Sequence, residues 1–200
     1  MDADAVEIRV LGCLIEKQRT TPDQYPLSMN ALRLACNQST NRDPVVDYDE
    51  RTIKAALDRM SDRGWTRLAS GAGSRALKYR HLLGEALELS EPELSLLAVL
   101  MLRGPQTPGE LKQRTERLYR FESVGAVGET LDELARRELV ARLERRPGQK
   151  EDRYAQLLGE ELGSDPSGQT PAAPDRLTEI EARLQRLEHV FDELSARLTE

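Results

Sequence analysis

One pattern, a helix followed by two short strands, occurs twice in this chain and constrains its fold more than any other feature. The copies span residues 49–87 and 123–162. Each begins with three apolar residues at helical spacing: Ile53, Leu57 and Met60 in the first copy, and Val127, Leu131 and Leu134 in the second. Each continues with an apolar strand, a turn bearing Gly or Pro, and a second strand. Because two separate segments show the same order of a helical apolar pattern followed by two strand patterns, we predict a repeated helix–hairpin unit.

A helix followed by a hairpin with a loose tip is the second half of a winged helix. The copies begin about 75 residues apart, which is close to the size of one such domain. We therefore predict a mainly α chain with small antiparallel wings, in the α+β class. The expected parts are winged-helix domains at residues 1–84 and 85–163, a Pro-, Gly- and Ser-rich linker at 164–174, and an amphipathic heptad helix at 175–200.

Capping signals place the remaining helices. An apolar stripe through Val6, Val10, Leu11 and Leu14 predicts a first helix, with Arg9 and Glu16 on its opposite side. Ser28 and Asp49 are suitable N-caps for the second and third helices, and Ser90 and Thr107 for two helices of the second domain. We expect loops at residues 23–27 and 37–44, because both are rich in turn-forming residues.

The last segment carries apolar residues at alternating spacings of three and four: Leu177, Ile180, Leu184, Leu187, Phe191, Leu194 and Leu198. This heptad seam predicts a coiled-coil helix that needs a partner surface. Arg–Glu pairs at flanking positions favour a parallel homodimer. Docking of the helix onto its own chain is the competing interpretation, since the seam is short and Phe191 is bulky.

The first domain holds the candidate nucleic-acid-binding residues. On its third helix, the side away from the apolar stripe carries Arg51, Lys54, Ala55, Asp58 and Arg59. A third helix of this kind reads the major groove when its exposed side carries donors. Arg42 in the preceding loop, and Arg75 and Lys78 on the wing, are candidates for phosphate contacts. The alternative is an ordinary solvated face, because acidic residues are interleaved with the basic ones.

The second domain is a weaker candidate. Its third helix has Gly125, Gly128 and Glu129 where the first has Arg51, Lys54 and Ala55. The two glycines indicate either close approach of another backbone or a frayed first turn. Its wing carries Arg145, Arg146 and Lys150, for which phosphate contact is one interpretation and a solvated hairpin tip is the favoured one.

Charge and composition narrow the function classes. The formal net charge of −6 argues against indiscriminate nucleic-acid binding, yet residues 1–84 carry 13 basic against 11 acidic residues. We expect no cofactor or metal, because no nucleophile–His pair, metal spacing or phosphate loop is found, and hence no enzyme. Cys13 and Cys36 are expected to be buried thiols of a cytoplasmic protein. No apolar run reaches membrane-spanning length.

Two long strings also carry a resemblance. VLGCLIEKQRTTPDQYPLSMNALRLACNQSTNRDPVVDY and MLRGPQTPGELKQRTERLYRFES resemble the bacterial YceH-like family, and the match runs over about residues 4–160. The resemblance implies two winged-helix domains in one chain and a bacterial cytosolic setting. It transfers no catalytic or binding residues.

The sequence leaves two functions open. The first is a non-enzymatic DNA-binding or transcription-associated protein, which the basic positions of the first domain favour. The second is an adaptor that binds another protein and uses winged helices as a scaffold, as accessory subunits of chromosome condensation complexes do. The second domain favours the adaptor, because residues 85–162 carry 12 basic against 16 acidic residues. Fold alone does not choose between the two functions.

Overall fold

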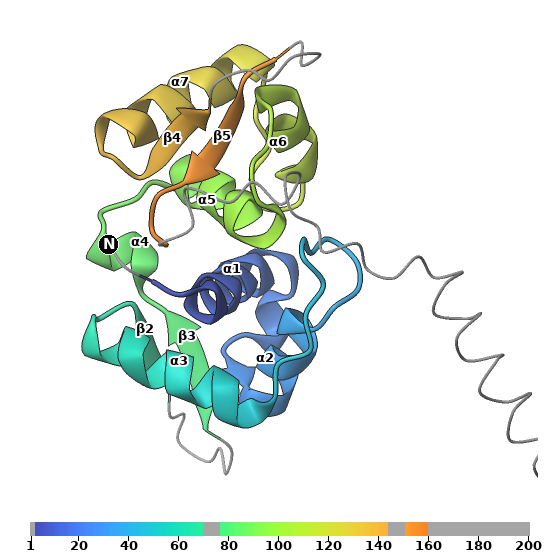
Figure 1. The fold of residues 1–200 in the computed structure, drawn as a ribbon, viewed down its shortest axis with the longest axis vertical. Helices are drawn as coiled ribbons and strands as arrows, with labels where there is room; N and C mark the ends of the chain where they lie inside the picture. The colour runs from blue at the N-terminus through green and yellow to red at the C-terminus, as the bar shows by residue number, and fades with distance from the viewer. Residues whose placement is uncertain (1–2, 70–76, 144–150, 160–200) are drawn as a thin grey trace, which may run out of the picture. The chain divides into compact units, whose positions relative to one another are not determined.

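A computed structural model describes residues 3–69, 77–143 and 151–159 of the chain (Figure 1). The described part is mainly helical with two small antiparallel sheets, in agreement with the predicted α+β class. In chain order the elements are α1 (Ala5–Thr20), η1 (Pro22–Gln24), β1 (Leu27–Ser28), α2 (Met29–Cys36), α3 (Glu50–Asp62), β2 (Thr66–Ala69), β3 (Lys78–His81), α4 (Leu83–Ala86), α5 (Glu91–Arg103), α6 (Pro108–Arg114), α7 (Val124–Arg136), β4 (Val140–Leu143) and β5 (Arg153–Gln156).

The first half of the chain combines three helices with a three-stranded sheet of order β1-β3-β2. Strands β2 and β3 pair antiparallel, with Thr66 opposite His81 and Ala69 opposite Lys78. Strand β1 pairs with the other edge of β3, with Leu27 opposite Tyr79. The predicted loop at 23–27 therefore begins within the short 3-10 helix η1 and ends in strand β1 at Leu27, so the prediction is wrong at both ends. A strand of two residues is too short to give a periodic signal, so pairing with β3 determines it.

The second half repeats this order. Helices α5, α6 and α7 precede the antiparallel hairpin β4–β5, in which Ala141 lies opposite Ala155. In place of β1, a single bridge joins Gln106 to Tyr154, through backbone hydrogen bonds of 3.0 and 2.8 Å. The predicted recurrence of helix and hairpin is thus present in the fold.

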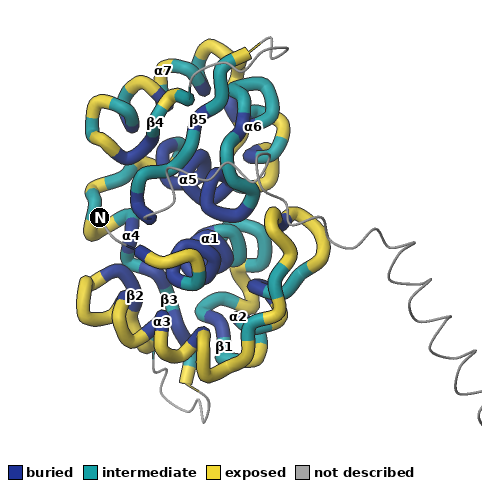
Figure 2. Tube along the Cα trace, viewed as in Figure 1, coloured by how far each residue is buried: buried dark blue, intermediate teal, exposed yellow. Residues whose placement is uncertain are grey.

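Helices α1 and α5 form the centre of the described structure, where the two halves pack against each other (Figure 2). Each is buried around most of its circumference, and the buried apolar residues of both halves belong to one continuous core. The two helices approach each other so closely at Gly12 that a larger residue would not fit. A Cβ built on Gly12 of α1 would lie 2.9 Å from the side chain of Leu102 on α5.

This packing corrects one expectation for α1. Arg9 was expected on an exposed side, but its side chain is buried. Its guanidinium donates to the backbone carbonyls of Cys36, at 3.1 Å, and Pro44, at 2.5 Å. A stripe of apolar residues identifies one buried face, and the second buried face of α1 exists only because α5 covers it.

The capping residues behave as the sequence predicts. Ser28, Asp49 and Thr107 each accept a hydrogen bond from a backbone amide in the first turn of their helix, and Ser90 belongs to a capping box with Glu93. These bonds satisfy backbone donors that have no partner within the helix. The bonds of Ser28 and Asp49 fix the starts of α2 and α3, where the candidate site lies.

Several predicted features lie outside the described residues. They are the linker at 164–174, the heptad helix with its seam from Leu177 to Leu198, and four basic wing residues, Arg75, Arg145, Arg146 and Lys150. Among the helices of the described ranges, none has the length and apolar character that crossing a bilayer requires.

Candidate nucleic-acid interface

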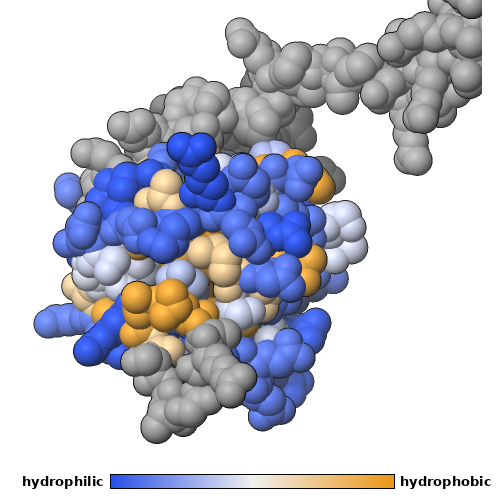
Figure 3. Space-filling view, turned by 90° about the horizontal axis from the view of Figure 1, so that it is seen from below, coloured by the Kyte–Doolittle hydropathy of each residue, from blue (hydrophilic) through white to orange (hydrophobic). Residues whose placement is uncertain are grey.

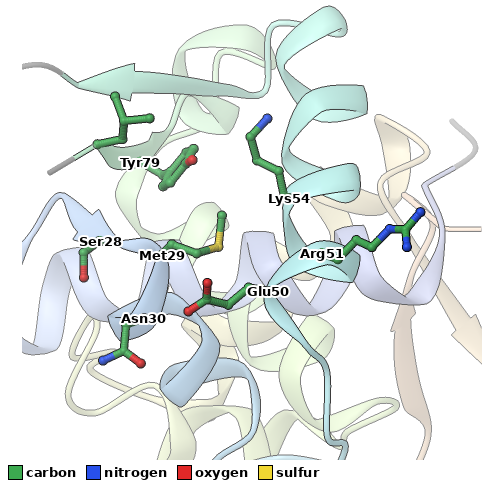
Figure 4. Close-up of a pocket in the computed structure, with 8 residues that line it drawn as sticks. Ser28, Met29, Asn30, Glu50, Arg51, Lys54 and Tyr79 are labelled. Carbon is green, nitrogen blue, oxygen red and sulfur yellow. The ribbon is translucent and has the colours of Figure 1, made fainter.

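An open groove of about 630 Å³ lies between the starts of α2 and α3 and the edge of β3 (Figure 4). Met29 and Tyr79 line it together with the polar residues Ser28 and Asn30. Figure 4 shows Lys54 pointing over the groove, whereas Arg51 extends away from it along the outer side of α3. The groove therefore has an apolar base and polar or charged residues along its edges.

Helix α3 presents its donors because its other face is firmly anchored. Ile53, Leu57 and Met60 are buried, whereas Arg51, Lys54 and Ala55 are exposed. The Asp49 carboxylate caps the helix by accepting from the Thr52 amide at 2.7 Å, and hydrogen bonding to Thr52 lowers the pKa of this carboxyl. The division into buried and exposed faces is the one predicted from the sequence.

The charges beside the groove are partly compensated. Lys54 Nζ lies 2.5 Å from an Asp58 carboxylate oxygen, and this hydrogen bond raises the pKa of the lysine. Glu50, another groove residue, lies 3.9 Å from Arg33 on α2. Among the described residues, Arg51 forms no ion pair with a carboxylate. Its guanidinium is thus the donor on this face that is most available to a phosphate or a base edge.

Arg59, the third basic residue proposed on α3, contacts α1 instead. Its Nε donates to the buried Glu7 carboxylate at 3.2 Å, and its Nη2 pairs with Asp4. Although the side chain is half-exposed, it connects the end of α3 to the start of α1. A ligand would have to compete with two carboxylates for this guanidinium, which reduces its value as a DNA contact.

The surface position expected for Arg42 is wrong. Its side chain has no solvent exposure, and its guanidinium forms a two-point contact with Glu16 on α1, at 2.6 and 3.2 Å. Its Nε donates to the Ala35 carbonyl at 3.1 Å. Loop 37–44 is largely exposed, as predicted, but this one side chain turns inward to bind the end of α2 to α1. Polar composition does not reveal such a reversal.

The wing contributes apolar as well as basic surface. Lys78 is half-buried at the start of β3, while Leu77 beside it and Leu68 on β2 are among the most exposed large apolar residues. Figure 3, which views the end of the molecule formed by α3 and this hairpin, shows an apolar area among hydrophilic atoms. Met29 and Asn30 were not identified as site residues from the sequence, since nothing local indicates that the start of α2 adjoins the wing.

On the second half, the described positions of α7 that correspond to Arg51 and Lys54 carry no side-chain donor. Helix α7 exposes Val124, Gly125 and Glu129. A Cβ on Gly128 would meet no atom within 4 Å, so the described residues contain no backbone in close approach to it. The glycines of α7 are therefore not required by packing within this part of the chain.

The two cysteines are free and buried, as expected. Contact with the Cys13 thiol and burial raise the pKa of Cys36. Across residues 3–69, 77–143 and 151–159, no group of three His, Cys, Asp or Glu side chains is arranged to hold a metal ion. Neither thiol thus belongs to a ligand set within these ranges.

Comparisons with known proteins agree with the resemblance noted above. A family described as "Protein of unknown function, DUF480" matches residues 3–149. A Geotalea daltonii protein named "UPF0502 protein" is 49% identical over 190 residues, which cover 94% of this chain and 86% of the relative. An Escherichia fergusonii protein named "UPF0502 protein YceH" is 43% identical over 201 residues, covering 97% of this chain and 93% of the relative.

Proposed function

The chain belongs to the DUF480 family of YceH-like bacterial proteins, and we propose that it is a non-enzymatic DNA-binding protein built from two winged-helix domains. The first domain makes the principal contact with duplex DNA. Helix α3 enters the major groove, and the hairpin β2–β3 lies against the flanking backbone.

The winged-helix assignment is supported by the order and pairing of the elements. In the first half, three helices precede the β2–β3 hairpin, and a short strand before α2 pairs with β3. The second half has the same order, with the Gln106–Tyr154 bridge at the corresponding position. Helix α3 is the third helix of its unit, which is the one that reads DNA in this class of domain.

One observation carries the proposal: the first turns of α3 expose Arg51 and Lys54 beside a groove that the start of α2 and β3 complete. Arg51 provides a planar donor group suited to guanine edges or phosphate. Lys54 adds a point charge. When DNA binds, its ammonium group would exchange the Asp58 carboxylate for a phosphate. Asn30, at the start of α2, adds an amide on the opposite side of the groove.

The double substitution Arg51→Ala/Lys54→Ala tests this proposal. Loss of a base-reading contact typically costs about 1–3 kcal/mol, so affinity for duplex DNA should fall at least tenfold. Both side chains are exposed, so the fold should persist. A matched control removes two exposed cations from other surfaces, Arg120 and Arg136. Equal affinity in the test and control variants would exclude α3 from the interface.

A protein-interaction adaptor is the second candidate, favoured by the donor-free face of α7. Val124 is exposed there, and the adjacent glycines leave room for a partner backbone. The adaptor predicts a protein complex that Val124→Arg abolishes and that Arg51→Ala/Lys54→Ala leaves intact. A complex that persists in Val124→Arg but is lost in Arg51→Ala/Lys54→Ala would place the partner on α3 and exclude α7.

A further inference from the structure

A second cleft, of about 590 Å³, lies where the two halves of the described structure meet. Its walls come from the ends of α1 and α5, from loop 37–44, from α6 and from the turn that follows α6. It shares no lining residue with the α3 groove. Its volume is within the range of small-molecule sites, which are roughly 300–1,000 Å³.

The cleft is lined by a concentration of positive charge. Among its described lining residues, Lys17, Arg103, Arg114 and Arg117 are cationic, and Glu16 is the single carboxylate. Glu16 is already neutralised by its two-point contact with the buried Arg42, at 2.6 and 3.2 Å. The local excess of positive charge contrasts with the formal net charge of −6 for the chain.

Nearby acidic groups compensate this excess only in part. Arg114 lies 3.6 Å from Glu110, one turn away on α6, and Lys17 lies 3.7 Å from Glu16. Arg103 donates to the Asn41 side chain, which is neutral. Among the described residues, neither Arg103 nor Arg117 forms an ion pair with a carboxylate. Two guanidinium groups of this cleft are therefore available to an anion.

The pKa of Arg103 is lowered from its usual value, in part by its cationic neighbours. Burial lowers the pKa of this guanidinium, and the neighbouring charges of Arg114 and Arg42 lower it further, against the opposing effects of Glu16 and Asp43. Like charges held together in a partly desolvated cleft repel one another. A bound anion would relieve that repulsion, and guanidinium groups bind phosphate oxygens through paired, charge-assisted hydrogen bonds.

We propose that this cleft is a binding site for a small phosphate-bearing molecule, with Arg103, Arg114 and Arg117 as the groups that hold its phosphates. Several cations lining one cleft match an anion carrying two or more phosphates better than a single phosphate. The apolar lining residues Val99, Leu102 and Leu118 provide a surface for the uncharged remainder of the ligand. The concave shape and the multiple wall elements favour a small molecule over a DNA duplex.

Calorimetric titration of the full chain with inorganic pyrophosphate, and separately with inorganic phosphate, tests the site. Wild-type protein should bind pyrophosphate with a dissociation constant below about 1 mM, and phosphate at least tenfold more weakly. Arg117→Gln should weaken pyrophosphate binding about tenfold, and Arg103→Gln should do the same. Arg117 is exposed, so its replacement keeps the test valid even if the Arg103 variant fails to fold.

The matched control is Arg120→Gln, which makes the same charge change three residues away. The Arg120 side chain is 85% exposed, pairs with Glu116 at 3.4 Å and does not line the cleft. The Arg120→Gln variant should bind pyrophosphate as wild type does. Absence of pyrophosphate binding at millimolar concentration, or an equal loss in the Arg120 variant, would overturn the proposal. The proposal would also be overturned if the Arg103→Gln and Arg117→Gln variants bound pyrophosphate as wild type does but bound duplex DNA more weakly. The cleft would then belong to the DNA surface.

Discussion

Gly12 on α1 faces Leu102 on α5 so closely that a Cβ at Gly12 would lie 2.9 Å from the Leu102 side chain and 3.1 Å from the Cβ of Met101. This approach joins the two halves of the molecule, since α1 begins the first half and α5 begins the second. It also explains a glycine inside a long helix, where glycine costs roughly 1 kcal/mol relative to alanine.

Substitution of Gly12 by alanine should therefore destabilise the protein. Although alanine favours the helix, the added methyl group has no space between α1 and α5, and overpacking of this kind typically costs about 1–3 kcal/mol. Gly128→Ala on α7 is the matched control, because a Cβ there meets nothing within 4 Å. It should stabilise by up to about 1 kcal/mol. Urea unfolding measures both changes, and shifts of the same sign would contradict this account of the packing.

Replacement of Arg42 by methionine should lower the free energy of unfolding by about 3–5 kcal/mol. The change leaves the Glu16 carboxylate without its closest partner in a largely buried position, and breaking a buried pair usually costs this much. Arg120→Met, at an exposed position, should change stability by less than about 0.5 kcal/mol. Similar unfolding midpoints for the two variants would show that the Arg42–Glu16 pair contributes little.

Stability should fall with acidification because of His81. Burial, followed by the nearby charges of Arg19 and Arg80, lowers the pKa of this imidazole to about 4. The unfolded chain binds the proton at about pH 6.5, so the unfolded state gains protons first as the pH decreases. The contribution of His81 is complete above pH 6.5 and is lost towards pH 4, at about 1.4 kcal/mol per pH unit.

The difference in unfolding free energy between wild type and His81→Gln isolates this effect, since carboxylates titrate equally in both proteins. His81 Nε2 lies 2.7 Å from Gln18 Oε1, and a glutamine amide can donate to the same acceptor. A difference that does not vary between pH 7 and 4 would show that the folded protein tolerates a charged imidazole.

The heptad seam from Leu177 to Leu198 predicts a homodimer, although it lies outside the described residues. Light scattering at tens of micromolar, roughly the range in which so short a coil associates, should give twice the chain mass for the full-length protein. A version ending at Ser164 should be a monomer. If both are monomers, the homodimer is wrong, and the seam docks on its own chain or on another protein.

Those features of the fold that depend on local pattern can be predicted from the sequence. The repeat, the capping residues and the two faces of α3 follow from periods and capping preferences within single segments. The burial of Arg9 and Arg42 and the pairing of β1 could not be predicted in this way. They depend on which distant segment covers α1 or adjoins β3.

The same limit applied to the candidate site. Arg51 and Lys54 can be predicted as site residues because both lie on one exposed helix face. Asn30 and Met29 cannot be predicted in this way, because they lie beside the groove only when the start of α2 meets β3. The basic cleft is assembled from α1, α5, loop 37–44, α6 and the turn after α6, so no single segment of the sequence predicts it.

The most direct test of the DNA-binding proposal is the affinity of the wild-type protein for a random-sequence duplex, measured by fluorescence anisotropy over a range of salt concentrations. Phosphate contacts release counterions, so the logarithm of the association constant should decrease linearly with the logarithm of the salt concentration. We expect binding at low salt that weakens steeply as salt is added. Absence of binding at low salt would contradict the DNA-binding proposal and favour the adaptor.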